Sequence, residues 1–136
     1  MKPNPLLLDT SGLLCVLDKS EARHSLASSL FHSPRSKVVH SYVLAELIPL
    51  CRSRGVPVEL AVRFSLALIS NPLVKVVWID EAVHQAALLL IDSRRDKRYS
   101  LCDAVSFVLM RMYSIQEALT TDKHFEQEGF VRLLAE

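Results

Sequence analysis

Short apolar runs alternate along the chain with longer segments of helical periodicity. Runs rich in leucine and β-branched residues predict strands at 5–9, 38–41, 74–79, 118–120 and 131–133. Apolar residues that recur every three or four positions predict helices at 12–18, 21–31, 42–52, 58–70, 81–92, 100–113 and 122–128. Strands that alternate with helices are typical of a parallel sheet with helices on both faces. We therefore expect a three-layer α/β/α fold, with a central, mostly parallel sheet of four to five short strands.

Two of the predicted helices carry further detail. In helix 58–70 one apolar stripe is expected to face the core, and it consists of Val58, Ala61, Val62, Ser65, Leu66 and Ile69. In helix 42–52, Pro49 lacks the backbone N–H that a helix interior uses. We expect this proline to kink or shorten the helix.

The composition excludes several classes of protein. Of the 136 residues, 50% are hydrophobic and 23% are charged, so a disordered chain, a fibrous repeat and a low-complexity linker are excluded. The length corresponds to one domain, and we expect a single domain over residues 1–136. The 16 basic and 15 acidic residues give a net charge of +1. That balance excludes a strongly basic nucleic-acid coat protein but leaves room for a local basic surface.

The cysteines and the N-terminal segment indicate the compartment. Cys15, Cys51 and Cys102 are odd in number, lie among apolar residues and include no CxxC pair, so neither a disulfide framework nor a cysteine zinc site is expected. The apolar run 6–8 is too short for a signal peptide, and no apolar segment reaches the roughly 20 residues of a membrane span. We expect a cytoplasmic protein with no membrane association.

Four acidic residues are placed where a parallel sheet carries its functional site, beyond the C-terminal ends of the strands. Asp9 ends the first predicted strand, and Asp122 follows the fourth. Glu46 lies early in the helix after the second strand, and Asp103 lies in the first turn of the apolar helix near the C-terminus. We expect the four carboxylates to converge, and converging carboxylates do not all stay ionised without a cation between them. Ligands that are all oxygen atoms suit Mg²⁺ or Mn²⁺.

Each of these acids also has a purely structural alternative. Asp9 and Asp122 are suited to cap the helices that follow them, and Ser100 with Asp103 fits a capping box. Glu46 has apolar neighbours, so its carboxylate either points to solvent or needs a partner, because an unpaired buried charge is costly. The combination of the four residues, more than any one of them, favours a metal site.

The four acids lie in four segments, which are LLLDTSGLL at 6–14, SYVLAEL at 41–47, YSLCDAVSF at 99–107 and ALTTDKHF at 118–125. In this order the segments resemble those of PIN-domain ribonucleases, most closely the VapC-like toxins of type II toxin–antitoxin systems. The resemblance covers nearly the whole chain. It implies that an acidic pocket binding one or two divalent cations is formed by Asp9, Glu46, Asp103 and Asp122. It also implies that hydroxyl groups orient the carboxylates or bound water, and these are Thr10, Ser100 and Thr120, for which helix capping is the alternative role.

The same resemblance implies an activity and partners. A PIN-like enzyme of this kind hydrolyses RNA phosphodiester bonds, leaving a 5′ phosphate and a 3′ hydroxyl, with metal ions that neutralise the scissile phosphate and activate water. It implies an RNA substrate, a cognate antitoxin protein and a homodimer. Two alternatives remain open: a PIN-like module that binds RNA or protein without cutting, and a housekeeping RNA-processing nuclease.

Basic residues cluster shortly before Asp103, and they are Arg94, Arg95, Lys97 and Arg98. Their closeness to Asp103 favours contacts with RNA phosphates at the rim of the site. The alternative is a solvated helix end that Asp92 and Asp96 partly neutralise. His124 matches a position of the family, but packing or capping is its expected role. With four acids assigned to a metal site, 16 basic and 11 acidic residues remain, so the net charge of +1 is compatible with RNA binding.

Overall fold

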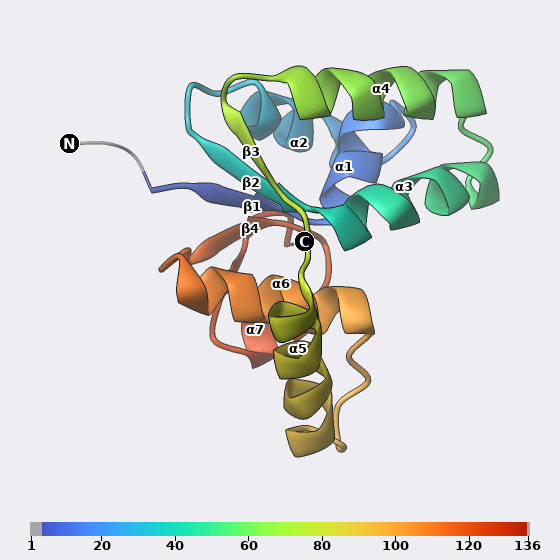
Figure 1. Cartoon of the computed structure of the whole chain (residues 1–136). Coiled ribbons are helices and arrows are strands. Elements are labelled where there is room, and N and C mark those ends of the chain that lie inside the picture. The colour runs from blue at the N-terminus through green and yellow to red at the C-terminus, as the bar shows by residue number, and fades with distance from the viewer. Residues whose placement is uncertain (1–3, 136) are drawn as a thin grey trace.

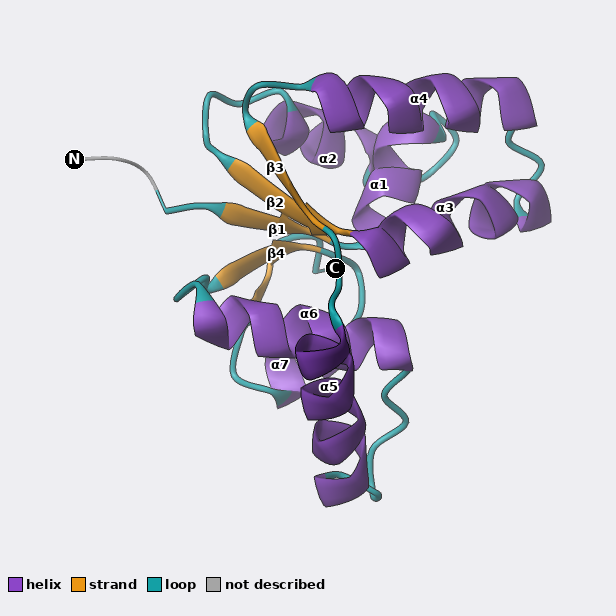
Figure 2. Cartoon of the chain, viewed as in Figure 1, coloured by secondary structure: helices purple, strands orange, loops and turns teal. Residues whose placement is uncertain are grey.

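A computed structural model describes residues 4–135, in which seven helices surround a five-stranded sheet (Figure 2). The elements are β1 (Leu6–Leu8), α1 (Thr10–Leu17), α2 (His24–Phe31), β2 (Lys37–His40), α3 (Ser41–Ser53), α4 (Val58–Ser70), β3 (Val74–Val77), α5 (Glu81–Ser93), α6 (Leu101–Met112), β4 (Glu117–Leu119), α7 (His124–Gln127) and β5 (Val131–Arg132). The strand order is β3-β2-β1-β4-β5, and all four pairings are parallel. The predicted fold class is therefore confirmed.

The sheet separates two layers of helices, with α1 to α4 on one face and α5 to α7 on the other (Figure 1). Successive residues of a strand point to opposite faces. Accordingly, Leu6 and Leu8 belong to the core under α1 to α4, whereas Leu7 packs with Phe107 and Phe125 on the other side. All three leucines of β1 are fully buried, so this central strand is covered on both faces, as its unbroken apolar run predicts.

The parallel register aligns the C-terminal ends of the strands. Leu8 of β1 pairs with Leu119 of β4, and the next residue, Asp9, donates its backbone N–H to the Leu119 carbonyl at 3.2 Å. Helix α1 starts at once and passes very close to β4: a Cβ atom at Gly12 would lie 2.0 Å from the Leu119 carbonyl oxygen. Only glycine allows this approach, which holds the start of α1 against the end of β4.

Several helix boundaries differ from those predicted. Helix α1 begins at residue 10 instead of 12, because Asp9 already has the extended backbone of an N-cap. Helix α2 begins at residue 24 instead of 21, because the Asp18 carboxylate accepts hydrogen bonds from the Ser20 N–H and hydroxyl and holds a turn there. Helix α3 runs on to Ser53, so of the two expected effects of Pro49, a kink or a shortened helix, the shortening does not occur. Pro49 lies on the exposed side of the helix, where water can satisfy the carbonyl that it leaves free.

The predicted core stripe of α4 is also wrong in part. Ala61 and Leu68 are buried, but Val62, Leu66 and Ile69 are 42%, 62% and 43% exposed. Helix α4 is apolar around most of its circumference, and periodicity does not choose between adjacent apolar stripes that differ by a rotation of about 100°. The contacts with α2 and α3 make that choice.

The cysteines and the helix lengths bear on two further expectations. Cys15, Cys51 and Cys102 are free and buried, as expected for small apolar core residues. None of the helices within residues 4–135 is long and apolar enough to cross a membrane.

Candidate active site

The four predicted acids line one cavity at the C-terminal edge of the sheet. The cavity has a volume of about 480 Å³, and its lining residues are Asp9, Thr10, Ser11, Glu46, Pro49, Leu50, Ser100, Asp103 and Asp122. One acid comes from the β1–α1 junction, one from α3, one from the first turn of α6 and one from the loop after β4. The topology thus brings together carboxylates that are up to 113 residues apart in the sequence.

Asp9 is the most buried carboxylate of the group, with 5% of its surface exposed. Its Oδ2 accepts hydrogen bonds from the Thr120 hydroxyl at 2.7 Å and from the Ser11 hydroxyl at 2.8 Å. Burial raises the pKa of Asp9 to about 6, and the charge of Asp103 adds to the rise although the hydroxyl hydrogen bonds oppose it. The alternative role as a helix cap is not used, because the Asp9 side chain makes no capping hydrogen bond.

Asp103 completes a helix cap and also lines the cavity. Its backbone N–H donates to the Ser100 hydroxyl at 3.0 Å, and its Oδ2 accepts from the Ser100 N–H at 3.4 Å, which completes a capping box at the start of α6. The carboxylate nevertheless lines the cavity. Burial raises the pKa of Asp103, and the nearby charge of Asp122 raises it further.

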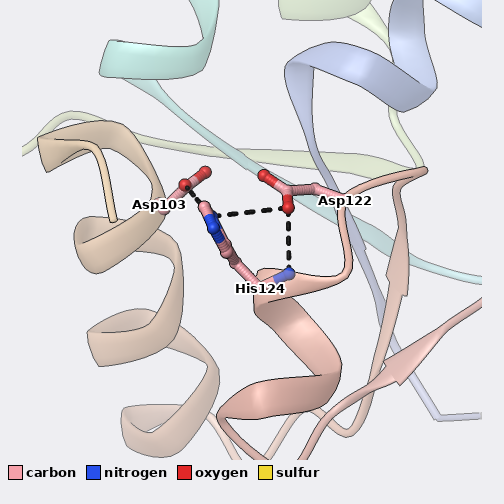
Figure 3. A group of neighbouring side chains, drawn as sticks. All are labelled: Asp103, Asp122 and His124. Carbon is pink, nitrogen blue, oxygen red and sulfur yellow. Dashed lines mark hydrogen bonds and ion pairs between the residues drawn. The ribbon is translucent and has the colours of Figure 1, made fainter. Parts of the chain in front are cut away.

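His124 is closer to the acids than the sequence predicted. Its Nδ1 lies 3.2 Å from Oδ2 of Asp103 and 3.4 Å from Oδ1 of Asp122 (Figure 3). The His124 backbone N–H also donates to Asp122 Oδ1 at 2.9 Å, so the loop after β4 holds this carboxylate in place. The three side chains could together hold a metal ion. The spacing of two residues from Asp122 was the available signal, and it did not reveal that the ring turns back toward Asp103.

Glu46 is held by the hydroxyl that the sequence had placed beside Asp9. The Thr10 hydroxyl donates to Glu46 Oε1 at 3.1 Å. Ser11, which the sequence did not single out, supports Asp9 instead. Glu46 is exposed, lines the cavity and also accepts a hydrogen bond from Thr10, so both of its alternatives hold in part.

Most of the basic residues before α6 have acidic partners. Arg94 contacts Glu128 at 3.0 Å, and Lys97 contacts Asp96 at 3.2 Å. Arg95 pairs in the same way with Asp92. Arg98 is exposed and forms no ion pair within the described residues 4–135, so it is the member of the cluster most available to an RNA phosphate.

Glu128 is a buried ion-pair centre that sequence reasoning missed. Its side chain is 3% exposed and also accepts hydrogen bonds from Arg111 at 2.9 Å and from the Tyr99 hydroxyl at 2.8 Å. Burial works against its charge, but these donors outweigh burial and lower the pKa of Glu128. Its partners lie 17 to 34 residues away, and no local pattern marks it.

The donor set fits a divalent cation. Within residues 4–135 the ion-pair partner found for the four carboxylates is His124 alone, so their negative charge is not balanced by lysine or arginine. Burial raises the pKa of both Asp9 and Asp103, and the charges of neighbouring carboxylates raise them further. Clustered carboxylate oxygens of this kind are ligands for hard cations.

Comparison with known proteins agrees with the fold. The PIN domain family model matches residues 6–130. A curated relative, the 23S rRNA-specific endonuclease VapC20 of Mycobacterium tuberculosis, is 29% identical over 136 residues, which span 96% of this chain and 99% of the relative. The crystal structure of VapC20, described as a sarcin–ricin loop cleaving toxin, superposes with a TM-score of 0.84 at 28% identity, over 93% of this chain and 96% of that one.

Two more distant structures share the fold alone. FitAcB from Neisseria gonorrhoeae has a TM-score of 0.62 at 17% identity, over 93% of this chain and 94% of that one. A toxin–antitoxin complex from Klebsiella pneumoniae has a TM-score of 0.59 at 15% identity, over 87% of each chain.

The chain belongs to the PIN domain family, whose members are nucleases. The predicted resemblance to VapC-like ribonuclease toxins is confirmed by the similarity to VapC20 over nearly the whole length of both chains.

Proposed function

We propose that this protein is a Mg²⁺- or Mn²⁺-dependent endoribonuclease and the toxin of a type II toxin–antitoxin pair. The observation that carries the proposal is the convergence of Asp9, Glu46, Asp103 and Asp122 on one cavity without a lysine or arginine to balance them. A cation held by these carboxylates supplies charge neutralisation at the scissile phosphate and lowers the pKa of the attacking water.

The chain's own residues provide the positioning. Thr120 and Ser11 fix the orientation of the Asp9 carboxylate, Thr10 fixes Glu46, and Ser100 fixes Asp103. Because each carboxylate already has its hydrogen-bond donors, little rearrangement is needed when substrate binds. Arg94, Arg95, Lys97 and Arg98 are proposed to contact the RNA backbone beside the site, with Arg98 contributing most.

The relative's activity suggests the class of substrate. VapC20 acts on 23S rRNA, and its structure is described as that of a toxin cleaving the sarcin–ricin loop. We therefore propose structured ribosomal RNA as the substrate of this chain, with 23S rRNA as the first RNA to assay.

Cleavage of purified ribosomes and of total RNA tests the activity. Wild-type protein with Mg²⁺ or Mn²⁺ is expected to give discrete products with 5′ phosphates, and EDTA should abolish them. Asp103→Asn removes one ligand charge at nearly constant volume and should lower the rate by at least about 100-fold. Equal activity of both proteins in EDTA contradicts the metal-dependent mechanism, and absence of cleavage by a sample that binds Mn²⁺ favours a binding module.

The proposed partners are an antitoxin protein and a second copy of this chain. The outer face of α4 exposes Val62, Leu66 and Ile69, and a cavity of about 260 Å³ lies between α2 and α4. Apolar surface of this kind supports docking of a protein segment, and we assign it to the antitoxin.

Co-expression with the product of an adjacent small gene should relieve growth arrest, and Leu66→Asp should weaken the complex while leaving RNA cleavage unchanged. A housekeeping nuclease would cause no arrest when expressed alone. Light scattering of the purified toxin measures whether it is a dimer.

A further inference from the structure

His40 occupies an unusual place for a histidine, at the junction of β2 and α3. The residue is fully buried, ends the strand and is the N-cap of the helix. Its Nδ1 accepts hydrogen bonds from the backbone N–H groups of Tyr42 at 3.2 Å and Val43 at 3.4 Å. Serine, threonine, aspartate and asparagine are the usual caps because a short side chain is sufficient for this task. Capping alone therefore does not require an imidazole ring.

The second ring nitrogen reaches the helix layer on the other side of the sheet. His40 Nε2 lies 2.8 Å from the Ser106 hydroxyl of α6. Since Nδ1 accepts from two N–H groups, the ring hydrogen is on Nε2, which is the donor toward α6. Burial lowers the pKa of His40 to about 4, so the ring stays neutral near neutral pH and keeps this arrangement of donor and acceptor.

The two helices that His40 joins carry two of the four carboxylates. Helix α3 carries Glu46, and α6 carries Asp103, three residues before the Ser106 that the ring contacts. The helices belong to opposite layers and approach each other beyond the end of the sheet (Figure 1). A shift of either helix would therefore change the separation of the carboxylates across the cavity.

We propose that His40 is a positioning residue of the nuclease, which fixes the distance between Glu46 and Asp103 by linking the start of α3 to the second turn of α6. The inference rests on the proposed metal site formed by the four carboxylates. His40 is not among the residues that line the cavity. Residues that orient ligands in this indirect way typically change metal affinity or activity by roughly 10- to 100-fold when substituted.

Two substitutions of His40 separate capping from linking. In His40→Asn the amide oxygen takes the place of Nδ1 and keeps the cap, but the side chain is too short to reach Ser106. In His40→Gln the longer side chain reaches Ser106, but the cap is lost. Ser106→Ala removes the partner on α6 and leaves His40 intact. We would measure Mn²⁺ affinity by electron paramagnetic resonance, kcat and KM for RNA cleavage, and the melting temperature of each metal-free protein.

Mn²⁺ affinity and melting temperature are expected to rank the variants in different orders. His40→Asn and Ser106→Ala should weaken Mn²⁺ binding and lower kcat by about 10-fold or more with KM nearly unchanged. His40→Gln should lower the melting temperature most and retain more of the Mn²⁺ affinity. The double variant His40→Asn with Ser106→Ala should be no worse than His40→Asn alone, because both remove the same link.

Other outcomes overturn the inference in distinguishable ways. If Mn²⁺ affinity follows the melting temperature across all variants, or stays at the wild-type level in His40→Asn and Ser106→Ala, His40 is only a structural cap. Asp103→Asn is the reference, since it should lose Mn²⁺ binding in a folded protein. If the wild-type protein itself binds no Mn²⁺, the proposed metal site fails, and the positioning role fails with it.

Discussion

The buried carboxylate of the single residue Asp9 lowers the stability of the metal-free protein. Its carboxylate is buried beside Asp103 and Asp122, so the metal-free protein holds a proton on it more tightly than the unfolded chain does. Between pH 4 and 6 the folded protein therefore binds more protons than the unfolded chain at this residue. Stability from this source is present at low pH and is lost as the pH rises through 6.

Asp9→Asn is expected to stabilise the metal-free protein while abolishing cleavage. The rise of the Asp9 pKa from 3.8 to about 6 corresponds to at most about 3 kcal/mol, and the variant should gain up to this amount above pH 7. The gain should shrink toward zero below about pH 3, where the wild-type carboxyl is protonated in both states. Urea denaturation of both proteins at several pH values in EDTA measures it. A variant that is less stable than the wild type at pH 7.5 contradicts the conclusion that the buried, ionised Asp9 carboxylate destabilises the metal-free protein.

The hydroxyl of Thr10 provides a second prediction at this scale. Thr10→Val keeps the shape of the side chain but removes the donor to Glu46, and cleavage should slow by about 10-fold or more. Thr10→Ser keeps the hydroxyl and should retain most of the activity. The comparison uses initial rates of cleavage, with melting temperatures as a check on folding. Equal rates for the valine and serine variants would show that Glu46 needs no such support.

At the scale of the elements, the start of α1 depends on close contact with β4. Gly12→Ala would place a Cβ atom 2.0 Å from the Leu119 carbonyl oxygen, and a backbone atom cannot move aside easily. We expect a loss of about 3 kcal/mol or more, or failure to fold. Gly55→Ala is the matched control, because its positive φ of 74° is mildly strained for alanine but no atom lies within 4 Å, so about 1 kcal/mol is expected. Urea unfolding measures both, and similar values for the two variants would contradict the close packing of α1 on β4.

The elements themselves were largely predictable from the sequence. The order of strands and helices follows from local periodicity, and helix α4 has the predicted bounds of 58–70. The predictions were wrong where a side-chain hydrogen bond sets a helix boundary or where neighbouring elements select the buried face of a helix. Asp18 delays the start of α2 by binding Ser20, and the partners of α4 select which apolar stripe is buried. These outcomes depend on atoms that a periodic pattern does not represent.

At the scale of the whole molecule, the charges beside the cavity determine how RNA can approach. Arg98→Ala should weaken binding of uncleaved RNA in an Asp103→Asn background and lower the slope of log K against log salt by about one, as expected for one lost phosphate contact. Arg63→Ala on α4 is the control, because α4 contributes no residue to the cavity. Fluorescence anisotropy over a range of salt concentrations measures both. An equal effect of the two substitutions would place the RNA path elsewhere.

The sequence by itself determined the order of the elements, the parallel sheet and the placement of four acids after strands or in first helix turns. These features follow from periodicity and from the rule that parallel strands end at one edge. The tertiary structure alone decided the partners: Thr10 with Glu46, Arg94 with Glu128, and His40 with Ser106, which are 36, 34 and 66 residues apart. Hydrogen bonds and ion pairs act over about 3 Å, and the chain's path in space, not its local pattern, brings such groups that close.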